Sequence, residues 1–234
     1  MTRSILSLKS VGLEFTVRAG GLRTSSIPIL TDINLDLIDG ETLGVIGPNG
    51  CGKSSLLRVM AGILAPTHGT LDISPRTTRA VLALGLGFRP ELTGRDNALL
   101  SAMLQGCTRA QAQHAIEPIY EFSELGEAFD RPVSTYSSGM RSRLGFSTAL
   151  ISQVEILFID EVLAVGDASF RRKASSALKE RISGEQTVVL VSHNLQEVER
   201  LCDRVLLIDA GRVAFLGGVE ETVGRYRQAV SGAA

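Results

Sequence analysis

The sequence predicts an α/β fold in which parallel strands support a phosphate-binding loop. Residues 47–54, Gly-Pro-Asn-Gly-Cys-Gly-Lys-Ser, fill the pattern G-x-x-x-x-G-K-[ST], which cradles the phosphates of a nucleotide. Residues 41–46 read as a short buried strand, and the residues after the loop place apolar side chains on one face of a helix. The runs 156–159 and 187–191 are almost wholly apolar, as strands buried on both faces of a parallel sheet are.

The composition favours one globular domain with a small subdomain. The chain has 234 residues, of which 44% are hydrophobic, and its formal net charge is −1. A nucleic-acid-binding protein usually carries a basic excess, so this charge argues against nucleic acid as a partner. The cysteines, Cys51, Cys107 and Cys202, have no metal-type spacing and favour reduced thiols in a cytoplasm. No apolar run approaches the roughly 20 residues that span a bilayer, so a membrane function would require another chain.

The N-terminal part predicts several short strands. Loosely alternating apolar residues over 5–15 predict an edge strand, and the polar residues 18–28 predict an exposed loop. Alternation resumes over 29–38 and ends at a hairpin-type turn, Asp39-Gly40, before the strand of the phosphate loop. Two further short strands are expected, at residues 70–73 and 80–84.

The central and C-terminal parts predict helices and a hairpin. From Asp96 to about Ala128 the apolar spacing is helical, and Asp96 is expected to cap the first helix. Residues 205–208 and 213–215 flank the turn Asp209-Ala210-Gly211, which predicts a β-hairpin.

The phosphate loop predicts the contacts of a bound nucleotide. Backbone N–H groups and the positive end of the following helix converge on an anion. Lys53 is expected to reach the β- and γ-phosphates, and Ser54 to offer its hydroxyl to Mg²⁺. The residues expected to bind the nucleotide here are Gly47, Pro48, Asn49, Gly50, Cys51, Gly52, Lys53, Ser54 and Ser55. The alternative is an ordinary glycine-rich turn, which the flanking strand and helix disfavour.

Two carboxylates follow the apolar run 156–159. A strand end beside a phosphate loop is where Mg²⁺ needs an acidic ligand, and Asp160 is the candidate. Glu161 points elsewhere and is the candidate general base for the attacking water. Alone, the pair would be read as a solvated acidic strand end, and the phosphate loop favours the functional interpretation.

His193 follows the next apolar strand, at the edge of the sheet where ligands of open α/β sheets collect. It is a candidate to donate a hydrogen bond to the γ-phosphate or to orient water. A structural histidine is the alternative.

Residues 134–140, Ser-Thr-Tyr-Ser-Ser-Gly-Met, form a small, hydroxyl-rich run before a helix that carries Arg141 and Arg143. The run is a candidate second anion site at a helix N-terminus, although alone it would be read as an N-capped turn. Asp160 follows Gly139 by 21 residues, which leaves room for one helix and one strand.

The ordered set of phosphate loop, serine–glycine segment, apolar strand with Asp-Glu, and Ser-His resembles the nucleotide-binding subunit of ABC transporters over essentially the whole chain. The resemblance implies a P-loop NTPase (RecA-like) core with an antiparallel β subdomain and a helical subdomain. Residues 1–90 and 150–215 would form the ATP-binding core with the β subdomain, 91–149 the helical subdomain, and 216–234 a C-terminal helix or tail.

By the same resemblance, two subunits would pack head to tail as a homodimer with ATP between them. The signature residues would contact the ATP held by the other subunit's phosphate loop; they are Tyr136, Ser137, Ser138, Gly139 and Met140. Asp167 matches the loop that touches across the dimer interface, and Phe15 is the aromatic expected to stack on adenine. The alternative for Phe15 is an ordinary strand residue.

Two segments narrow the resemblance to one group of ABC transporter ATPases. Residues 85–97 and 161–167 are similar to those of the ATPases that export O-antigen, capsule and teichoic acid. The chain ends about twenty residues after its last predicted hairpin, so we expect no C-terminal carbohydrate-binding domain. The sequence also departs from the family, because residues 84–90 lack the glutamine that usually contacts Mg²⁺, and no residue is assigned to that role.

The sequence therefore predicts an ATP-hydrolysing, Mg²⁺-dependent subunit at the cytoplasmic face of the inner membrane. Lys53, Glu161 and His193 are the expected catalytic residues, an integral-membrane permease is the expected partner, and a lipid-linked polysaccharide is the expected cargo. Three alternatives remain: another cargo such as a drug, lipid or small solute, a soluble ABC ATPase acting on ribosomes or DNA, and a regulatory subunit that has lost turnover.

Overall fold

The computed structural model describes residues 3–18, 24–82, 85–150, 154–160, 167–182, 184 and 186–232. The chain divides into two compact units. The first comprises residues 1–81, 155–161 and 182–234, and the second comprises residues 82–154 and 162–181.

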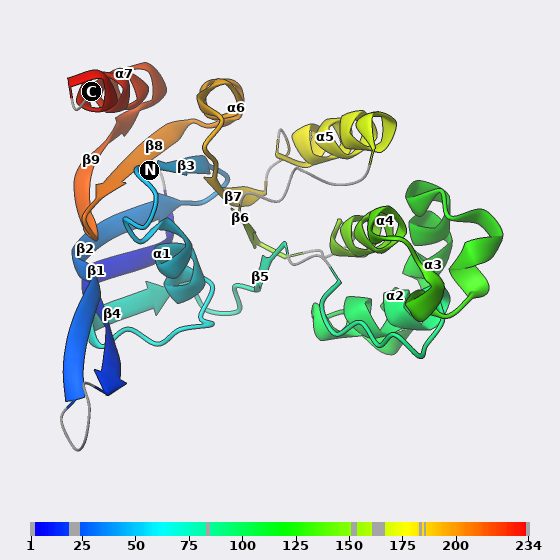
Figure 1. The fold of residues 1–234 in the computed structure, drawn as a ribbon. Helices are drawn as coiled ribbons and strands as arrows, with labels where there is room; N and C mark the ends of the chain where they lie inside the picture. Colours follow the sequence, from blue (N-terminus) through cyan, green and yellow to red (C-terminus); the bar gives the residue numbers. More distant parts are fainter. Residues whose placement is uncertain are drawn as a thin grey trace. The chain divides into compact units, whose positions relative to one another are not determined.

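Within its described residues, the first unit contains two β-sheets (Figure 1). The smaller sheet is antiparallel, has the order β2-β1-β4, and consists of β1 (Ser4–Arg18), β2 (Thr24–Ile38) and β4 (His68–Ile73). The larger sheet has the order β5-β6-β7-β3-β8-β9. Its strands are β3 (Thr42–Ile46), β5 (Arg79–Val81), β6 (Ile156–Asp160), β7 (Thr187–Val191), β8 (Arg204–Asp209) and β9 (Arg212–Gly218). All its neighbouring strands are parallel except β9, which pairs antiparallel with β8.

Helix α1 (Lys53–Met60) packs between the two sheets, since it contacts β2 on one side and β6 and β7 on the other. Its residues Leu56, Leu57 and Met60 are buried in the core that both sheets share, which confirms the predicted apolar face. The opposite face of the large sheet is covered by α6 (Leu195–Leu201) and α7 (Val219–Gly232). The buried parallel strands predicted from the apolar runs are therefore confirmed, because helices cover both faces of the sheet.

The second unit is helical in its described residues. Its elements are α2 (Gly94–Leu104), α3 (Arg109–Ser123), the short 3₁₀ turns η1 (Gly126–Asp130) and η2 (Val133–Thr135), α4 (Ser138–Ala149) and α5 (Ala168–Ile182). A buried cluster that includes Ala98, Ile119, Phe129 and Leu144 joins α2, α3, η1 and α4.

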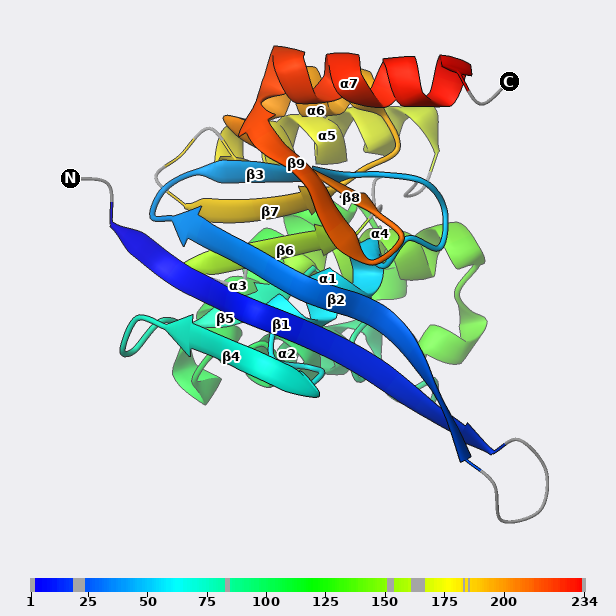
Figure 2. The same cartoon turned by 90° about the vertical axis from the view of Figure 1, so that its left-hand side faces the viewer.

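The prediction of an edge strand at residues 5–15 is wrong. Strand β1 is the middle strand of the small sheet, because it pairs with β2 on one side and with β4 on the other (Figure 2). The predicted loop at residues 18–28 is also too long, since β2 already begins at Thr24. The β1–β2 pairing runs from Ser4–Ile38 to Arg18–Thr24, whereas the β1–β4 pairing stops at Gly12–His68, so the two long strands continue as a two-stranded ribbon.

Helix α2 begins two residues earlier than predicted. Its N-cap is Thr93, whose hydroxyl accepts a hydrogen bond from the Asp96 backbone N–H, so Asp96 lies in the first turn instead of capping the helix. The predicted helical stretch from 96 to 128 is two helices, because Gly106 adopts a positive φ of 97° and Thr108 starts α3 with a capping box to Gln111. Among the helices of the described residues, not one combines the length and hydropathy needed to cross a membrane.

Candidate functional site

The phosphate loop connects the end of β3 to the start of α1, as the sequence predicts. Three of its glycines adopt positive φ angles: Gly47 at 151°, Gly50 at 76° and Gly52 at 107°. Gly52 is the N-cap of α1 and has no side chain, so the N–H groups of the first turn lack a side-chain cap. This arrangement suits an anion, which would receive these N–H groups and the positive end of the helix dipole.

The backbone of the loop is fixed by its contact with β8. A Cβ atom on Gly47 would lie 2.1 Å from the Ile208 carbonyl oxygen and 2.9 Å from the Cys51 Sγ. A Cβ atom on Gly50, by contrast, would meet no atom within 4 Å. Gly47 is therefore required by space as well as by its φ angle, whereas Gly50 is required by its φ angle alone.

We expect Gly47→Ala to lower the free energy of unfolding by about 2–6 kcal/mol, since backbone strain and overpacking each cost about 1–3 kcal/mol. The matched control is Gly50→Ala. Its alanine would also adopt a positive φ angle but would meet no neighbouring atom, so it should cost only about 1 kcal/mol. Denaturant unfolding without nucleotide measures both. Equal losses for the two variants would contradict the close contact between Gly47 and Ile208.

Lys53 is buried, with 7% of its surface exposed, at the first position of α1. Its Nζ atom donates hydrogen bonds to the carbonyl oxygens of Gly47 and Pro48, both at 2.8 Å. The ammonium group is thus held beside the loop that precedes its own helix, within the segment where phosphates would lie. A buried ammonium group needs such partners, and a phosphate oxygen would be a stronger one.

Ser54 and Asp160 come together although 106 residues separate them along the chain. The Ser54 hydroxyl donates to Asp160 Oδ1 at 3.2 Å, and Asp160 is the last residue of β6. A hydroxyl and a carboxylate oxygen are the hard ligands that Mg²⁺ uses beside nucleotide phosphates. The side chains present therefore fit the metal site that the sequence predicts.

The edge of the sheet also places His193. Strands β6, β7 and β3 are neighbours, and Asp160 lies opposite Val191, the last residue of β7. His193 follows two residues later and its side chain is exposed, just before Asn194 caps α6. The first unit thus brings Lys53, Ser54, Asp160 and His193 to the carboxyl edge of its parallel strands. Glu161, the predicted general base, lies outside the described residues.

Cys51 lies within the loop but points into the protein. It is 6% exposed and belongs to the core shared by the two sheets. Burial raises the pKa of its thiol, and the nearby Lys53 charge opposes this only in part. A buried thiol with a raised pKa reacts slowly with alkylating agents, because the thiolate is the reactive form.

We therefore expect iodoacetamide to modify Cys51 more slowly than the partly exposed Cys107. Once Cys51 is modified, the added group should displace the loop and block ATP binding. Peptide mass spectrometry measures the modification, and nucleotide binding is then measured on the Cys107→Ser variant. Unchanged ATP binding after complete modification of Cys51 would contradict the loop geometry.

Phe15 lies on the two-stranded ribbon and is 44% exposed. Ile27 is its cross-strand partner on β2 and is 45% exposed, so the two neighbouring side chains form one exposed apolar patch. Strand β2 also packs against the phosphate loop at Leu30, three residues after Ile27. A Cβ atom on Gly52 of that loop would lie 2.9 Å from Leu30 Cδ2. Ile27 is a candidate base-contacting residue that the sequence analysis missed, because it assigned residues 18–28 to a loop.

The serine–glycine segment lies in the second unit, at the start of α4. Ser137 is the N-cap and accepts a hydrogen bond from the Met140 N–H at 3.2 Å. Ser138 beside it is exposed, whereas Tyr136 is buried and donates its hydroxyl to the Ala128 carbonyl at 2.6 Å. Burial raises the pKa of Tyr136, which stays a neutral hydrogen-bond donor. Tyr136 thus anchors the segment, while Ser137 and Ser138 face outward at a helix N-terminus.

Asp167, also in the second unit, holds the start of α5. Its Oδ1 accepts hydrogen bonds from the backbone N–H groups of Ser169 and Phe170, both at 3.0 Å. Its Oδ2 forms an ion pair with Arg143 of α4. The sequence placed Asp167 at a dimer contact, and the structure adds these contacts within the chain.

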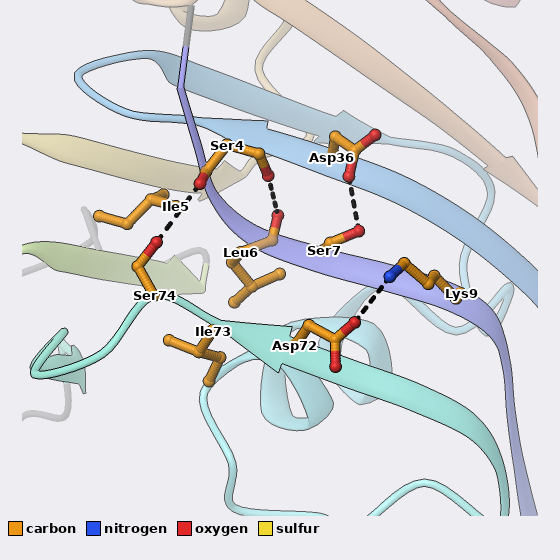
Figure 3. Close-up of a pocket in the computed structure, with 9 residues that line it drawn as sticks. All are labelled: Ser4, Ile5, Leu6, Ser7, Lys9, Asp36, Asp72, Ile73 and Ser74. Carbon is orange, nitrogen blue, oxygen red and sulfur yellow. Dashed lines mark hydrogen bonds and ion pairs between the residues drawn. The ribbon is translucent and has the colours of Figure 1, made fainter.

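A shallow pocket of about 430 Å³ lies on the small sheet (Figure 3). Its lining includes Lys9, Asp72, Ser7 and Asp36, and the predicted site residues are not part of it. Lys9 pairs with Asp72 at 2.8 Å, and Ser7 donates to Asp36 at 2.6 Å. The polar groups are therefore satisfied by one another, and the pocket gives no sign of a ligand.

Comparison with known proteins supports one family. A family model described as "ABC transporter" matches residues 30–164. The O-antigen export system ATP-binding protein RfbB of Klebsiella pneumoniae is 47% identical over 204 residues, covering 86% of this chain and 82% of that protein. RfbB of Myxococcus xanthus is 45% identical, with coverage of 88% and 47%. The teichoic acids export ATP-binding protein TagH of Levilactobacillus brevis is 41% identical, with coverage of 88% and 58%. The chain thus spans most of the first relative and about half of the other two.

Two solved structures share the fold. One is the ATP-binding cassette MJ0796 as a dimer with ADP and Pi, with a TM-score of 0.73 at 20% identity, covering 92% of this chain and 98% of that one. The other is an ATP-binding subunit of an ABC transporter, with a TM-score of 0.74 at 23% identity, covering 95% and 93%. At this identity the likeness concerns the fold, and it confirms the predicted α/β class.

Proposed function

Because the chain belongs to the ABC transporter family, we propose that it is the ATP-hydrolysing subunit of a transporter that exports a lipid-linked polysaccharide across the inner membrane. The cargo is proposed from the export systems named in its relatives, which handle O-antigen and teichoic acids. Segments 85–97 and 161–167 support the same cargo by their similarity to such exporters.

ATP binding is supported by the phosphate loop. The glycine backbone from Gly47 to Gly52 presents N–H groups, and Lys53 stands beside them with its ammonium group buried. On binding, the Lys53 ammonium would exchange the Gly47 and Pro48 carbonyls for phosphate oxygens, which are charged and form stronger hydrogen bonds. Phe15, with Ile27 opposite, would take the adenine ring.

Turnover requires the residues at the end of β6. The observation that carries this proposal is the contact between Ser54 and Asp160, which brings a hydroxyl and a carboxylate that could serve as Mg²⁺ ligands together beside the loop. Bound Mg²⁺ would neutralise charge on the phosphate oxygens. Glu161 would accept a proton from the attacking water, and His193 would donate a hydrogen bond to the γ-phosphate or orient that water.

Two copies of the chain would form the working unit. Ser137 and Gly139 would contact the ATP held by the phosphate loop of the partner copy, and Asp167 would lie at the contact between copies. Residues 91–149, as the helical subdomain, would transmit motion to a membrane permease, and 1–90 with 150–215 would form the core. In this arrangement the protein sits peripherally at the cytoplasmic face of the inner membrane.

The site is tested by the metal dependence of ATP hydrolysis. We expect the purified protein to hydrolyse ATP only with Mg²⁺, and Asp160→Asn to lower the rate at least 10–100-fold, because mutation of even an outer-shell partner of a metal ligand costs about that much. Asp209→Asn is the matched control, because Asp209 ends β8 at the same edge of the sheet. An inactive unmodified protein would contradict the motor assignment, and normal Mg²⁺ dependence in Asp160→Asn would remove Asp160 from the metal role.

A further inference from the structure

The hairpin turn between β8 and β9 is attached to the phosphate loop. The pair Asp209–Arg212 closes the hairpin around a turn of two residues. Ala210 and Gly211 form this turn with positive φ angles of 44° and 75°, which is the geometry of a type I′ turn. The Gly211 N–H donates a hydrogen bond to the Cys51 carbonyl oxygen at 3.0 Å. The backbone of the turn therefore holds the backbone of the loop.

Gly211 also contacts β2, which lies beside β9 (Figure 2). Its carbonyl oxygen accepts a hydrogen bond from the Thr31 N–H at 2.8 Å. A Cβ atom on Gly211 would lie 2.4 Å from the Ile29 carbonyl oxygen, so the turn has no room for a side chain at this position. One glycine thus connects the phosphate loop with β2.

The same stretch of β2 packs directly against the phosphate loop. A Cβ atom on Gly52, the N-cap of α1, would lie 3.1 Å from the Ile29 carbonyl oxygen and 2.9 Å from Leu30 Cδ2. Leu30 is buried in the core cluster that also contains Cys51. The backbone at Ile29 therefore approaches two glycines, one in the turn and one in the loop.

This stretch of β2 leads into the ribbon that carries the exposed apolar patch. Ile27, the partner of Phe15, lies two residues before Ile29, which is about 7 Å along an extended strand. The pairing of β1 with β4 ends at Gly12–His68, so at the patch β1 pairs with β2 alone among the described strands. The contacts of Ile29 with the turn and the loop therefore fix the distance from the patch to the loop.

We propose that Gly211 is a positioning residue that sets this distance, and that the distance makes the site selective for nucleoside triphosphates over inorganic tripolyphosphate. The inference rests on the proposed function, in which Phe15 and Ile27 take the base and the loop takes the phosphates. A nucleotide reaches both only where their separation matches its own length. Tripolyphosphate needs the loop alone, so its binding does not depend on the separation.

The variant that changes the separation is Gly211→Ala, because its methyl group would displace β2 from the turn. We expect it to weaken binding of a non-hydrolysable ATP analogue about 5- to 150-fold, the contribution of stacking a base on an aromatic side chain. Tripolyphosphate affinity should change far less, since the variant keeps the N–H that binds Cys51. The ratio of the two dissociation constants, measured by titration calorimetry with Mg²⁺, should approach one.

Gly69→Ala is the matched control. Gly69 lies on β4 with a φ angle of 76°, and a Cβ atom there would lie 2.3 Å from the Ser10 carbonyl oxygen of β1. The control therefore carries the same backbone strain and the same kind of clash in the same sheet. The two variants should lower the melting temperature similarly, and only Gly211→Ala should lose the preference for the nucleotide. An equal loss of preference in both would overturn the role of Gly211.

A double variant tests whether the lost contact is the one with the base. Phe15→Ala should lower the preference for the ATP analogue in the unmodified chain. It should have no further effect in Gly211→Ala, because the base contact is then already lost. Additive losses would overturn the proposal, since the patch would still reach the base in Gly211→Ala.

A milder pair of variants applies the same test without a clash, so that it holds even where Gly211→Ala does not fold. Leu30→Val removes a methylene from the side chain that packs against Gly52. Leu35→Val makes the same change at another buried position of β2. The preference for the ATP analogue should fall in Leu30→Val and persist in Leu35→Val. An unchanged preference in both would overturn the spacing role.

The outcomes separate this inference from the proposed function. If the unmodified protein does not bind the ATP analogue, the proposed function fails. If it binds the analogue and tripolyphosphate equally, or if Gly211→Ala keeps the ratio of the unmodified protein, the spacing role is overturned while ATP binding stands.

Discussion

Glu161→Gln is expected to bind ATP with unchanged affinity while its turnover falls by about 10²–10⁴, the contribution of a general base in proton transfer. Glutamine has the shape of glutamate and cannot take the proton of the attacking water. Ser54 and Asp160 remain in contact at the proposed metal site, since neither is altered. The nucleotide should therefore bind and persist.

A second result follows for the same variant. If ATP bridges two copies, then a protein that binds ATP without hydrolysing it should accumulate as a dimer with twice the mass of one chain. Light scattering after size-exclusion chromatography measures this with and without ATP. Glu220→Gln on the exposed first turn of α7 is the control and should behave as the unmodified protein. Normal turnover in Glu161→Gln would remove Glu161 from the role of base.

Lys53→Ala is expected to weaken ATP binding by about 10- to 150-fold, since a hydrogen bond to a charged group contributes about 1.5–3 kcal/mol. The lysine is buried and lies beside the phosphate loop, where its charge is poorly screened. Titration calorimetry with Mg²⁺ and a non-hydrolysable ATP analogue measures the dissociation constant. Lys9→Ala is the control, because Lys9 is an exposed lysine of the same unit.

One complication is that Lys53 also binds the loop itself. Its removal leaves the Gly47 and Pro48 carbonyls without their ammonium partner, which could disturb the loop without any effect on phosphate. The melting temperature without nucleotide separates the two causes. An unchanged melting temperature with weakened binding supports the phosphate contact, and an unchanged dissociation constant contradicts it.

The parts of the fold that the sequence predicted are those with strong local patterns. The apolar run before the loop, the glycines and the helix after it are contiguous, so β3 and α1 were predicted together. The contact between Ser54 and Asp160 joins residues far apart in the sequence. It was predicted nevertheless, because the phosphate loop and Asp160 each follow a strand of the parallel sheet at the same edge.

Other features depend on neighbours that a local pattern does not specify. The alternation in β1 is the same for an edge strand and a central one, so its pairing with β4 was not predicted. Asp96 and Thr93 are both favourable N-cap residues, and in the structure Thr93 is the N-cap of α2. The ion pairs of Arg143 with Glu124 and Asp167 span 19 and 24 residues, and no spacing in the sequence indicates them.

The polysaccharide-export function is best tested in the native host, with the chromosomal copy replaced by Glu161→Gln and, as the control, by Glu220→Gln. Lipid-linked glycan is then measured on both sides of the inner membrane, together with polymer at the cell surface. Export driven by this chain predicts that the glycan accumulates inside and that surface polymer is lost only with Glu161→Gln. Normal surface polymer in a strain whose variant protein binds ATP and has lost turnover would contradict the export function and favour another cargo.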